Sequence, residues 1–213
     1  KSQSLRSSIV SHSKTLGYVP TSARAAKATV DVNLNTNTAS ATMSAGTVFN
    51  ASVDGVSYKF STITDVTKSN SGGTISFTNT DIYEGTFITT RYTVDTSDID
   101  QRFLLTDNRA DTSTLTVKVQ TSSTDTTTNT FTEATDITQV TASSNVYFLQ
   151  EVEAGLYEIY FGDGVIGTAL ADDNIIILTY IVSNKSAANG AALFTNAAVI
   201  AGVSDVAVAT VAA

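Results

Sequence analysis

The stretch FNASVDGVSYKF, residues 49–60, is the clearest local structural signal in the chain. Its centre, Asp54-Gly55, has the residue types of a two-residue hairpin turn in which both residues take positive φ. Pairing outward from this turn sets Phe49, Ala51 and Val53 opposite Phe60, Tyr58 and Val56. Because strand side chains alternate between faces, these six residues share one face. Turn chemistry and apolar pattern therefore predict the same register for an antiparallel hairpin.

Strand patterns continue on both sides of this hairpin. Apolar and polar residues alternate over 29–35 and again over 115–120, as expected for strands with one buried face. A second hairpin is predicted between 146–152 and 156–161, around Glu153-Ala154-Gly155. These patterns indicate antiparallel sheets.

Two further segments complete the predicted fold class. Residues 175–182 are apolar at nearly every position, which predicts a strand covered on both faces. Apolar residues at helical spacing predict a short helix over residues 2–16, which Gly17 and Pro20 would end. The predicted class is mainly β, α+β at the margin, with antiparallel β subdomains and one short N-terminal helix.

The predicted domain organisation follows changes in composition along the chain. A polar, acidic stretch near residues 95–112 is the expected boundary between two β subdomains. The resulting segments are a leading helix and turn (1–20), a β subdomain (21–96), a β subdomain with the FGDG corner (97–182), and C-terminal strands expected to continue into an absent segment (183–213).

Composition excludes several classes of function. The 213 residues carry a formal net charge of -8, which argues against nucleic acid as a partner because that binding depends on Lys and Arg. The chain contains no Cys, so disulfide scaffolds and thiolate sites are excluded. A catalytic triad or a His-rich metal site would need His12, the single histidine, which is expected on the surface of the predicted helix.

Membrane insertion is not expected either. The longest strongly apolar run, residues 175–182, is far shorter than the ~20 residues that span a bilayer as a helix. The mildly apolar stretch 191–213 contains Asp205 near its middle, where a charge is costly in lipid. Both segments are interpreted as strands.

The segment EIYFGDGVIG, residues 158–167, raises the question of a binding loop. A phosphate loop needs a Lys and a following helix, whereas Val165-Ile166-Gly167 follow Gly162-Asp163-Gly164 here. A calcium loop needs several oxygen ligands at short spacing, and Asp163 has no close acidic neighbour in sequence. We therefore expect a tight turn in which Asp163 accepts hydrogen bonds from nearby backbone N–H groups. No cofactor or metal is expected.

Acidic residues offer one candidate for catalysis. Glu151, Glu153 and Glu158 flank the second hairpin and could supply the two carboxylates of a glycoside hydrolase. Such groups are also common on exposed strand faces, and the chain has no Trp to stack against a sugar. Glu84-Gly85 could be catalytic as well, but a turn is the ordinary explanation. We expect no enzymatic activity.

Several stretches taken together resemble a known family. They are LGYVPTSARAAKATVDV (16–32), DIYEGTFITTRYTVD (81–95), RFLLTDNRADTSTLTVKV (102–119), NVYFLQEVEAGLYEIYFGDGVIG (145–167) and NGAALF (189–194). In this order and spacing they are similar to the baseplate wedge proteins of T4-like contractile-tailed phages, within the baseplate J-like family.

The resemblance implies a structural role. Wedge proteins of this family assemble with copies of themselves and with other wedge subunits into a sixfold ring around the tail tube, and the ring changes shape on contraction. By this likeness Phe161, Gly162, Asp163 and Gly164 form a signature corner, Glu84 and Gly85 form a second, and both are architectural. The implied location is the virion tail baseplate, assembled in the host bacterial cytoplasm. Family members are longer than this chain, with segments before and after it.

Two other classes of function remain as alternatives. A secreted bacterial adhesin or surface-layer β module fits an acidic, Thr-rich, Cys-free chain, and would be stabilised by calcium. A tail-associated glycan hydrolase fits the Glu residues of the second hairpin. Nucleic acid, membrane and small-molecule partners are not expected for the baseplate protein.

Overall fold

Strands dominate the fold, which is known here from a computed structural model that describes residues 21–196 and 198–213. Within these residues there are fourteen strands and three short 3-10 helices, so the mainly β class predicted from the sequence is confirmed. The helix expected over residues 2–16, together with His12, lies outside the described residues.

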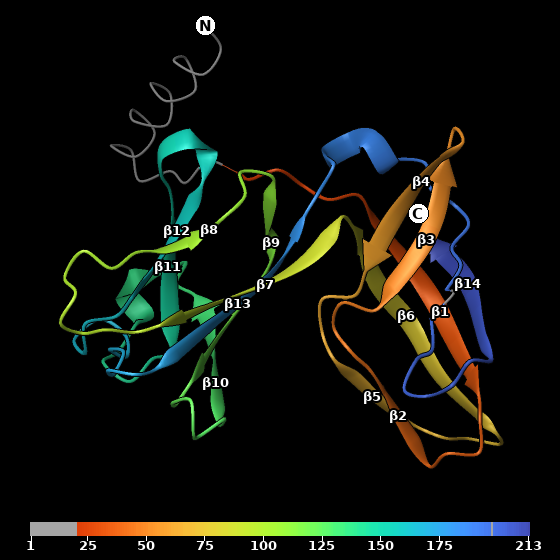
Figure 1. The fold of residues 1–213 in the computed structure, drawn as a ribbon, viewed down its shortest axis with the longest axis horizontal. Helices are drawn as coiled ribbons and strands as arrows, with labels where there is room; N and C mark the ends of the chain where they lie inside the picture. Colours follow the sequence, from red (N-terminus) through yellow and green to blue (C-terminus); the bar gives the residue numbers. More distant parts are fainter. Residues whose placement is uncertain (1–20, 197) are drawn as a thin grey trace, which may run out of the picture. The chain divides into compact units, whose positions relative to one another are not determined.

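The chain forms two compact units, and each unit combines segments that are distant in sequence (Figure 1). Of the described residues, unit 1 contains Ile88–Tyr180 with Thr21 and Ser22, whereas unit 2 contains Ala23–Phe87 and Ile181–Ala213. In unit 1, Ser22 accepts hydrogen bonds from Thr112 N and Thr112 Oγ1, both at 2.9 Å. The division into four consecutive segments at residues 20, 96 and 182 stays a prediction.

Unit 2 is built on a five-stranded sheet with a two-stranded sheet beside it in the same unit. The order in the larger sheet is β14-β1-β6-β4-β3, and the strands are β14 (Val206–Ala212), β1 (Lys27–Asn35), β6 (Thr74–Glu84), β4 (Val56–Ser61) and β3 (Val48–Val53). The smaller sheet pairs β2 (Ser40–Met43) with β5 (Val66–Ser69). Every second residue of β1 is buried, as the alternating sequence predicts. The core of unit 2 includes Val30, Val32, Leu34, Phe49, Phe60, Phe77 and Phe194.

The hairpin β3–β4 has the register expected from its sequence. Val53 is paired with Val56, Ala51 with Tyr58 and Phe49 with Phe60. Both turn residues have positive φ, 50° at Asp54 and 81° at Gly55, as a primed two-residue turn requires. The outer edge of β3 is covered by a bridge between Asn50 and Thr195, whose backbone groups exchange hydrogen bonds of 2.8 and 3.0 Å.

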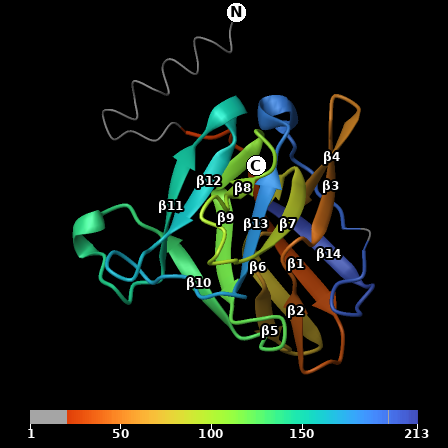
Figure 2. The ribbon, with the colours of Figure 1, turned by 60° about the vertical axis from the view of Figure 1, so that its left-hand side comes forward.

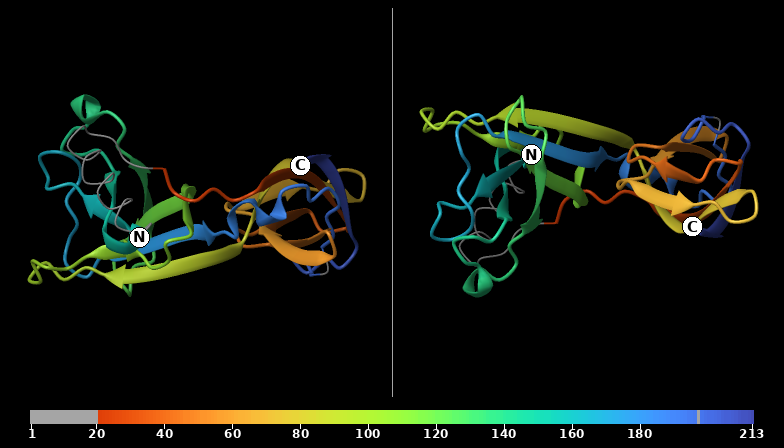
Figure 3. Two further views of the ribbon diagram at one scale, coloured as in Figure 1. Left: turned by 90° about the horizontal axis from the view of Figure 1, so that it is seen from above. Right: turned by 90° about the horizontal axis from the view of Figure 1, so that it is seen from below.

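A seven-stranded sheet, most of it in unit 1, has the order β7-β13-β9-β10-β11-β12-β8. The strands are β7 (Thr86–Thr93), β8 (Phe103–Leu105), β9 (Ala110–Gln120), β10 (Thr128–Glu133), β11 (Val146–Glu151), β12 (Tyr157–Phe161) and β13 (Ile175–Val182). Strands β10 and β11 are parallel, while β11–β12 and β12–β8 are antiparallel. Figure 3 shows β7 and β13 side by side. Burial is heavy along β13, as its continuous apolar sequence predicts.

This sheet curls so that its two edge strands approach each other. The Tyr92 hydroxyl of β7 donates a hydrogen bond of 2.7 Å to the Leu104 carbonyl of β8. The Tyr180 hydroxyl of β13 lies 3.2 Å from the backbone N of Thr106, just beyond β8. The enclosed core includes Leu105, Val117, Phe131, Leu149, Tyr157, Ile159, Ile176 and Leu178.

The second hairpin, β11–β12, also has the expected position (Figure 2). A 3-10 turn, Glu153–Gly155, joins the two strands. Ala154 takes φ of 59° and Gly155 takes φ of 74°, so the turn uses the left-handed region at two successive residues. The hairpin leads directly into the segment that follows Phe161.

Candidate functional site: the two glycine corners

The FGDG corner, defined as Phe161, Gly162, Asp163 and Gly164, begins at the last residue of β12 in unit 1. The Asp163 carboxylate accepts hydrogen bonds from the backbone N–H groups of Val165 and Ile166, both at 2.9 Å. The hydrogen bonds from these two N–H groups, and chiefly the one from Ile166, hold the pKa of Asp163 below its usual range. The carboxylate thus closes a turn around its own backbone, which is the arrangement that the sequence predicts.

The two glycines of this corner are required for different reasons. Gly164 has φ of 86°, in the left-handed region that favours glycine. Gly162 has no such φ, but a Cβ there would lie 2.3 Å from the carbonyl carbon of Gly167. The chain therefore folds back against itself at Gly162, and no side chain fits between the two segments.

Aromatic rings anchor the start of the corner. The Phe161 ring makes edge-to-face contacts with Phe131 and Phe103, at centroid distances of 5.5 and 5.9 Å. Phe103 in turn contacts the ring of Tyr92 at 5.7 Å. Such contacts add to the stability that burial of the rings supplies. Burial also raises the pKa of Tyr92.

The far side of the corner is exposed and apolar. The side chain of Val165 is 72% exposed and that of Ile166 is 41% exposed. The loop is tied back by Gly167 N, which donates to the Thr141 carbonyl at 3.0 Å, and by Thr168 N, which donates to the Ser144 carbonyl at 2.9 Å. The turn thus presents two adjacent apolar side chains to solvent.

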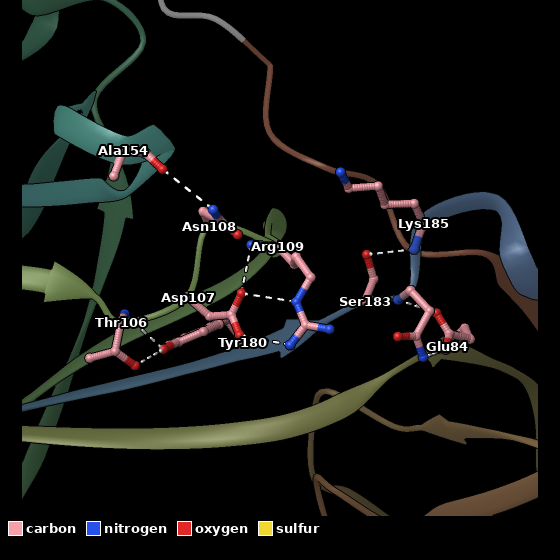
Figure 4. A network of polar contacts seen from close by, with 10 residues as sticks. Glu84, Thr106, Asp107, Asn108, Arg109, Ala154, Tyr180, Ser183 and Lys185 are labelled. Carbon is pink, nitrogen blue, oxygen red and sulfur yellow. Dashed lines mark hydrogen bonds and ion pairs between the residues drawn. The ribbon is translucent and has the colours of Figure 1, made fainter. Parts of the chain in front are cut away.

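The second corner, Glu84-Gly85, lies in unit 2 at the end of β6. Glu84 is 1% exposed, and its carboxylate accepts hydrogen bonds from Asn184 N and Asn184 Nδ2, at 2.9 and 2.8 Å. Gly85 has φ of 127°, and a Cβ there would lie 2.3 Å from the Val182 carbonyl oxygen. Figure 4 shows Glu84 and also Ser183, whose hydroxyl accepts a hydrogen bond from Lys185 N at 3.3 Å. Both corners are therefore built by close backbone approach.

Two of the three glutamates of the second hairpin, Glu151 and Glu158, do not share a face of the hairpin. Glu151 is paired with Tyr157 across β11 and β12, and Glu158 is the next residue along β12. Directly paired residues share a face and consecutive residues alternate, so Glu151 and Glu158 project from opposite faces of the hairpin. Glu153 lies in the turn between the strands and is exposed.

Glu158 has a different partner that the sequence did not suggest. Arg102 donates from Nε to Oε1 at 2.9 Å and from Nη2 to Oε2 at 2.5 Å, a bidentate pair. This ion pair raises the pKa of Arg102, chiefly through its hydrogen bonds to Glu158. The pair joins strand β12 to the residue before β8. Opposite charges 56 positions apart give no sequence signal, so this contact could be found only from the fold.

A second polar group in unit 1 was likewise not predicted. Asp107 accepts from Arg109 N at 2.8 Å and pairs with the Arg109 guanidinium, while Asn108 Nδ2 donates to the Ala154 carbonyl at 3.4 Å (Figure 4). The hydrogen bond from Arg109 holds the pKa of Asp107 below its usual range. These contacts connect the segment before β9 to the turn of the second hairpin. Their role is therefore structural.

Metal ligands do not gather at either corner. In residues 21–196 and 198–213, no three His, Cys, Asp or Glu side chains lie close enough together to hold a metal ion. Nor does the part of the chain that the structure describes contain a helix long and apolar enough to cross a membrane. Both corners are tight backbone turns, and the FGDG corner is followed by two exposed apolar side chains.

Comparison with known families identifies the segment that contains the FGDG corner. Residues 86–193 match the model of the bacteriophage baseplate wedge protein gp6, third domain. No curated protein sequence matches the chain. The match begins directly after Gly85, so the role of Glu84 and Gly85 as a family signature stays a prediction, as does that of the FGDG residues. Since the match covers more than half of the 213 residues, the chain belongs to the family of bacteriophage baseplate wedge protein gp6, third domain.

Proposed function

We propose that the chain is a structural subunit of a contractile phage tail baseplate, a wedge component of the sixfold ring around the tail tube. It works by assembly and by conformational change on contraction, without catalysis and without a cofactor. Its partners are copies of itself and other wedge subunits, not nucleic acid, a membrane or a small molecule. It is assembled in the host bacterial cytoplasm and resides in the virion. The observation that carries this proposal is the family match over residues 86–193.

The FGDG corner supports a role in assembly. Its loop is fixed by hydrogen bonds to Thr141 and Ser144 while Val165 and Ile166 remain exposed. A rigid apolar surface loses little conformational entropy when a partner covers it, which favours binding. In the proposal, both glycine corners are architectural, and the FGDG corner also displays contact residues.

Quantitative peptide mass spectrometry on purified, intact tails tests the proposed role. The chain is expected at a fixed, small whole number of copies per sixfold ring. Peptides of the tube and sheath proteins serve as internal standards for this copy number. Absence from the tails, or presence in trace amounts, would refute the baseplate role. Calcium-dependent melting of the purified chain would then point to the adhesin or surface-layer alternative.

A matched pair of variants tests the part of the proposal that concerns Val165. Val165→Asp places a charge in the proposed contact and is expected to reduce incorporation of the chain into tails. Thr124→Asp places the same charge in an exposed loop between β9 and β10 and is expected to leave incorporation unchanged. Equal incorporation of both variants would exclude Val165 from the subunit contact.

A further inference from the structure

Asparagine followed by glycine occurs once in the 213 residues, at Asn189-Gly190. Each of the other asparagines is followed by a residue that carries a side chain. A backbone nitrogen can attack the side-chain amide of the asparagine before it, and the attack is least hindered when the attacking residue has no Cβ. The sequence thus singles out one position for such a reaction, and whether the reaction occurs there depends on the local structure.

Asn189 and Gly190 are the two central residues of a turn in unit 2. Asn189 has φ of -62° and ψ of 134°, and Gly190 has φ of 94°. Ala191 N donates to the Ala188 carbonyl at 3.3 Å across the turn. These dihedral angles are those of a type II turn, whose third residue favours glycine. Both central residues are exposed, and no atom lies within 4 Å of the position of a Cβ on Gly190, so water reaches the pair.

The peptide group between Asn189 and Gly190 is free of hydrogen bonds to the rest of the described chain. Within residues 21–196 and 198–213, the Gly190 N–H donates none, and the Asn189 carbonyl and side-chain amide make none. At ψ of 134° the Gly190 nitrogen is turned away from the Asn189 side chain, so attack requires rotation of this peptide group. Because neither of its polar groups is bonded, the rotation breaks no hydrogen bond of that group.

Asn70, which precedes the small residue Ser71, shows the opposite arrangement. Its side-chain amide donates to the carbonyls of Thr36 and Thr38, at 2.6 and 2.9 Å. The N–H of Ser71 donates to the Thr74 carbonyl at 2.9 Å. Both the amide that would be attacked and the nitrogen that would attack are held, so several hydrogen bonds must break before they can react. The Asn-Gly pair is thus distinguished by its structure as well as by its sequence.

We propose that Asn189 is a site of spontaneous deamidation in the folded chain. The Gly190 nitrogen gives up its proton and bonds to Asn189 Cγ, while the Cγ–Nδ2 bond breaks and the amide nitrogen takes up a proton and leaves as ammonia. The cyclic succinimide then adds water at either carbonyl and opens to aspartate or to isoaspartate. Water is the only co-reactant, and either product adds one negative charge to the chain.

The isoaspartate product would disturb the core of unit 2. Its backbone runs through the side-chain carbons, which lengthens the chain by one methylene between Ala188 and Ala191. These two alanines are 1% and 4% exposed and belong to the core cluster. The hydrogen bond between them fixes their spacing, so a longer turn should loosen their packing.

Mass spectrometry of the purified chain, aged at mildly alkaline pH and then digested with trypsin, tests this proposal. No Lys or Arg follows Lys185, so a single peptide, residues 186–213, contains both Asn189 and Asn196. Deamidation raises the mass by about 1 Da, and fragment ions show which asparagine has changed. Labelling by an isoaspartate-specific methyltransferase then distinguishes isoaspartate from aspartate.

Asn196 is the internal control in this peptide. Its side-chain amide nitrogen donates to the Val48 carbonyl at 2.9 Å, and its amide oxygen accepts from Ala198 N at 3.0 Å. Deamidation at Asn189 should be at least about tenfold faster than at Asn196, because its amide is free and glycine follows it. Unfolding the chain in urea removes the bonds that hold Asn196, so the rate there should rise, whereas the rate at Asn189 should change less than about tenfold.

A matched variant, Asn189→Gln, tests the effect on the core. Glutamine would have to close a larger ring and therefore reacts far more slowly. The two fresh proteins should have the same melting temperature. After ageing, the unaltered chain should melt at a lower temperature than the aged variant.

Two results would overturn the proposal. One is a rate at Asn189 that is no higher than the rate at Asn196 in the folded chain. The other is modification of Asn189 in urea with none in the folded chain, which would show that the turn holds the peptide group in its unreactive orientation. Equal melting of the aged chain and the aged variant would overturn the predicted effect on the core. The measurement uses the isolated chain, so its outcome is separate from that of the tail analysis that tests the baseplate role.

Discussion

Asn184 donates two hydrogen bonds to the carboxylate of Glu84, from its backbone N–H at 2.9 Å and from its side-chain amide at 2.8 Å. The two residues are 100 positions apart in the chain. Their contact fastens the end of β6 to the segment that follows β13, within unit 2. A buried carboxylate with two donors from one residue is a strong local constraint.

Replacing this carboxylate should therefore destabilise unit 2. Glu84→Ala leaves the two Asn184 donors without the carboxylate, which should lower the free energy of unfolding by about 2–3 kcal/mol. The measurement is urea unfolding followed by circular dichroism. Glu133→Ala changes an exposed residue of β10 and serves as the control with little expected effect. Equal unfolding midpoints for the two variants would show that the Glu84 contact contributes nothing to stability.

Gly85→Ala tests the close backbone approach at the same corner. The added Cβ would lie 2.3 Å from the Val182 carbonyl oxygen, at a φ of 127° that other residues rarely adopt. The expected loss is about 3 kcal/mol or more, from backbone strain and steric overlap together. Gly72→Ala is the matched control, because Gly72 has φ of 63° with no atom within 4 Å of the added Cβ, and it should cost about 1 kcal/mol. Similar losses for both would mean that the corner relaxes around a side chain.

Local sequence patterns predicted those parts of the fold that depend on near neighbours. The hairpin at Asp54-Gly55 follows from a turn dipeptide and an alternating apolar pattern within twelve residues. The turn at Asp163 follows similarly, because the carboxylate binds backbone groups two and three residues ahead. In both cases the residues that form the turn lie close together within the segment itself.

Contacts between distant segments could not be predicted in this way. The Arg102–Glu158 ion pair and the Glu84–Asn184 contact depend on how strands are ordered in the sheets. A single sequence fixes the faces of a strand but not its neighbours. The close approach at Gly162 illustrates the same limit, since its φ is unremarkable and the need for glycine comes from Gly167 across the loop.

The stability of unit 1 should decrease at acid pH because of five aspartates that make the same local hydrogen bond. Each accepts a hydrogen bond from the backbone N–H two residues ahead. The pKa is lowered at each of Asp95, Asp107, Asp125, Asp136 and Asp163, mainly by hydrogen bonds from the following residues.

A lowered pKa in the folded state means that the unfolded chain binds more protons, so acid favours unfolding. The stability supplied by these carboxylates is fully present above the unshifted value of 3.8 and is lost as the pH falls through their lower folded values. We expect the melting temperature of unit 1 to fall as the pH is lowered from 5 to about 3. Asp136→Asn, at an exposed turn, should reduce the steepness of this fall in differential scanning calorimetry. A slope unchanged in this variant would exclude Asp136 from the effect.

The FGDG corner itself offers a test that separates steric from conformational demands on glycine. Gly162→Ala places a Cβ 2.3 Å from the Gly167 carbonyl carbon and should cost about 3 kcal/mol or more, because the obstacle is backbone that cannot move aside cheaply. In Gly164→Ala the added Cβ would lie 3.7 Å from the Ala169 Cβ, which is an ordinary contact. The loss of stability should therefore come only from the φ of 86° and amount to about 1 kcal/mol. Gly164→Asn should cost less than Gly164→Ala, because asparagine tolerates the left-handed region. Urea unfolding of the three variants measures these differences. If Gly164→Ala proved more damaging than Gly162→Ala, the fold-back against Gly167 would not be what requires glycine at this corner.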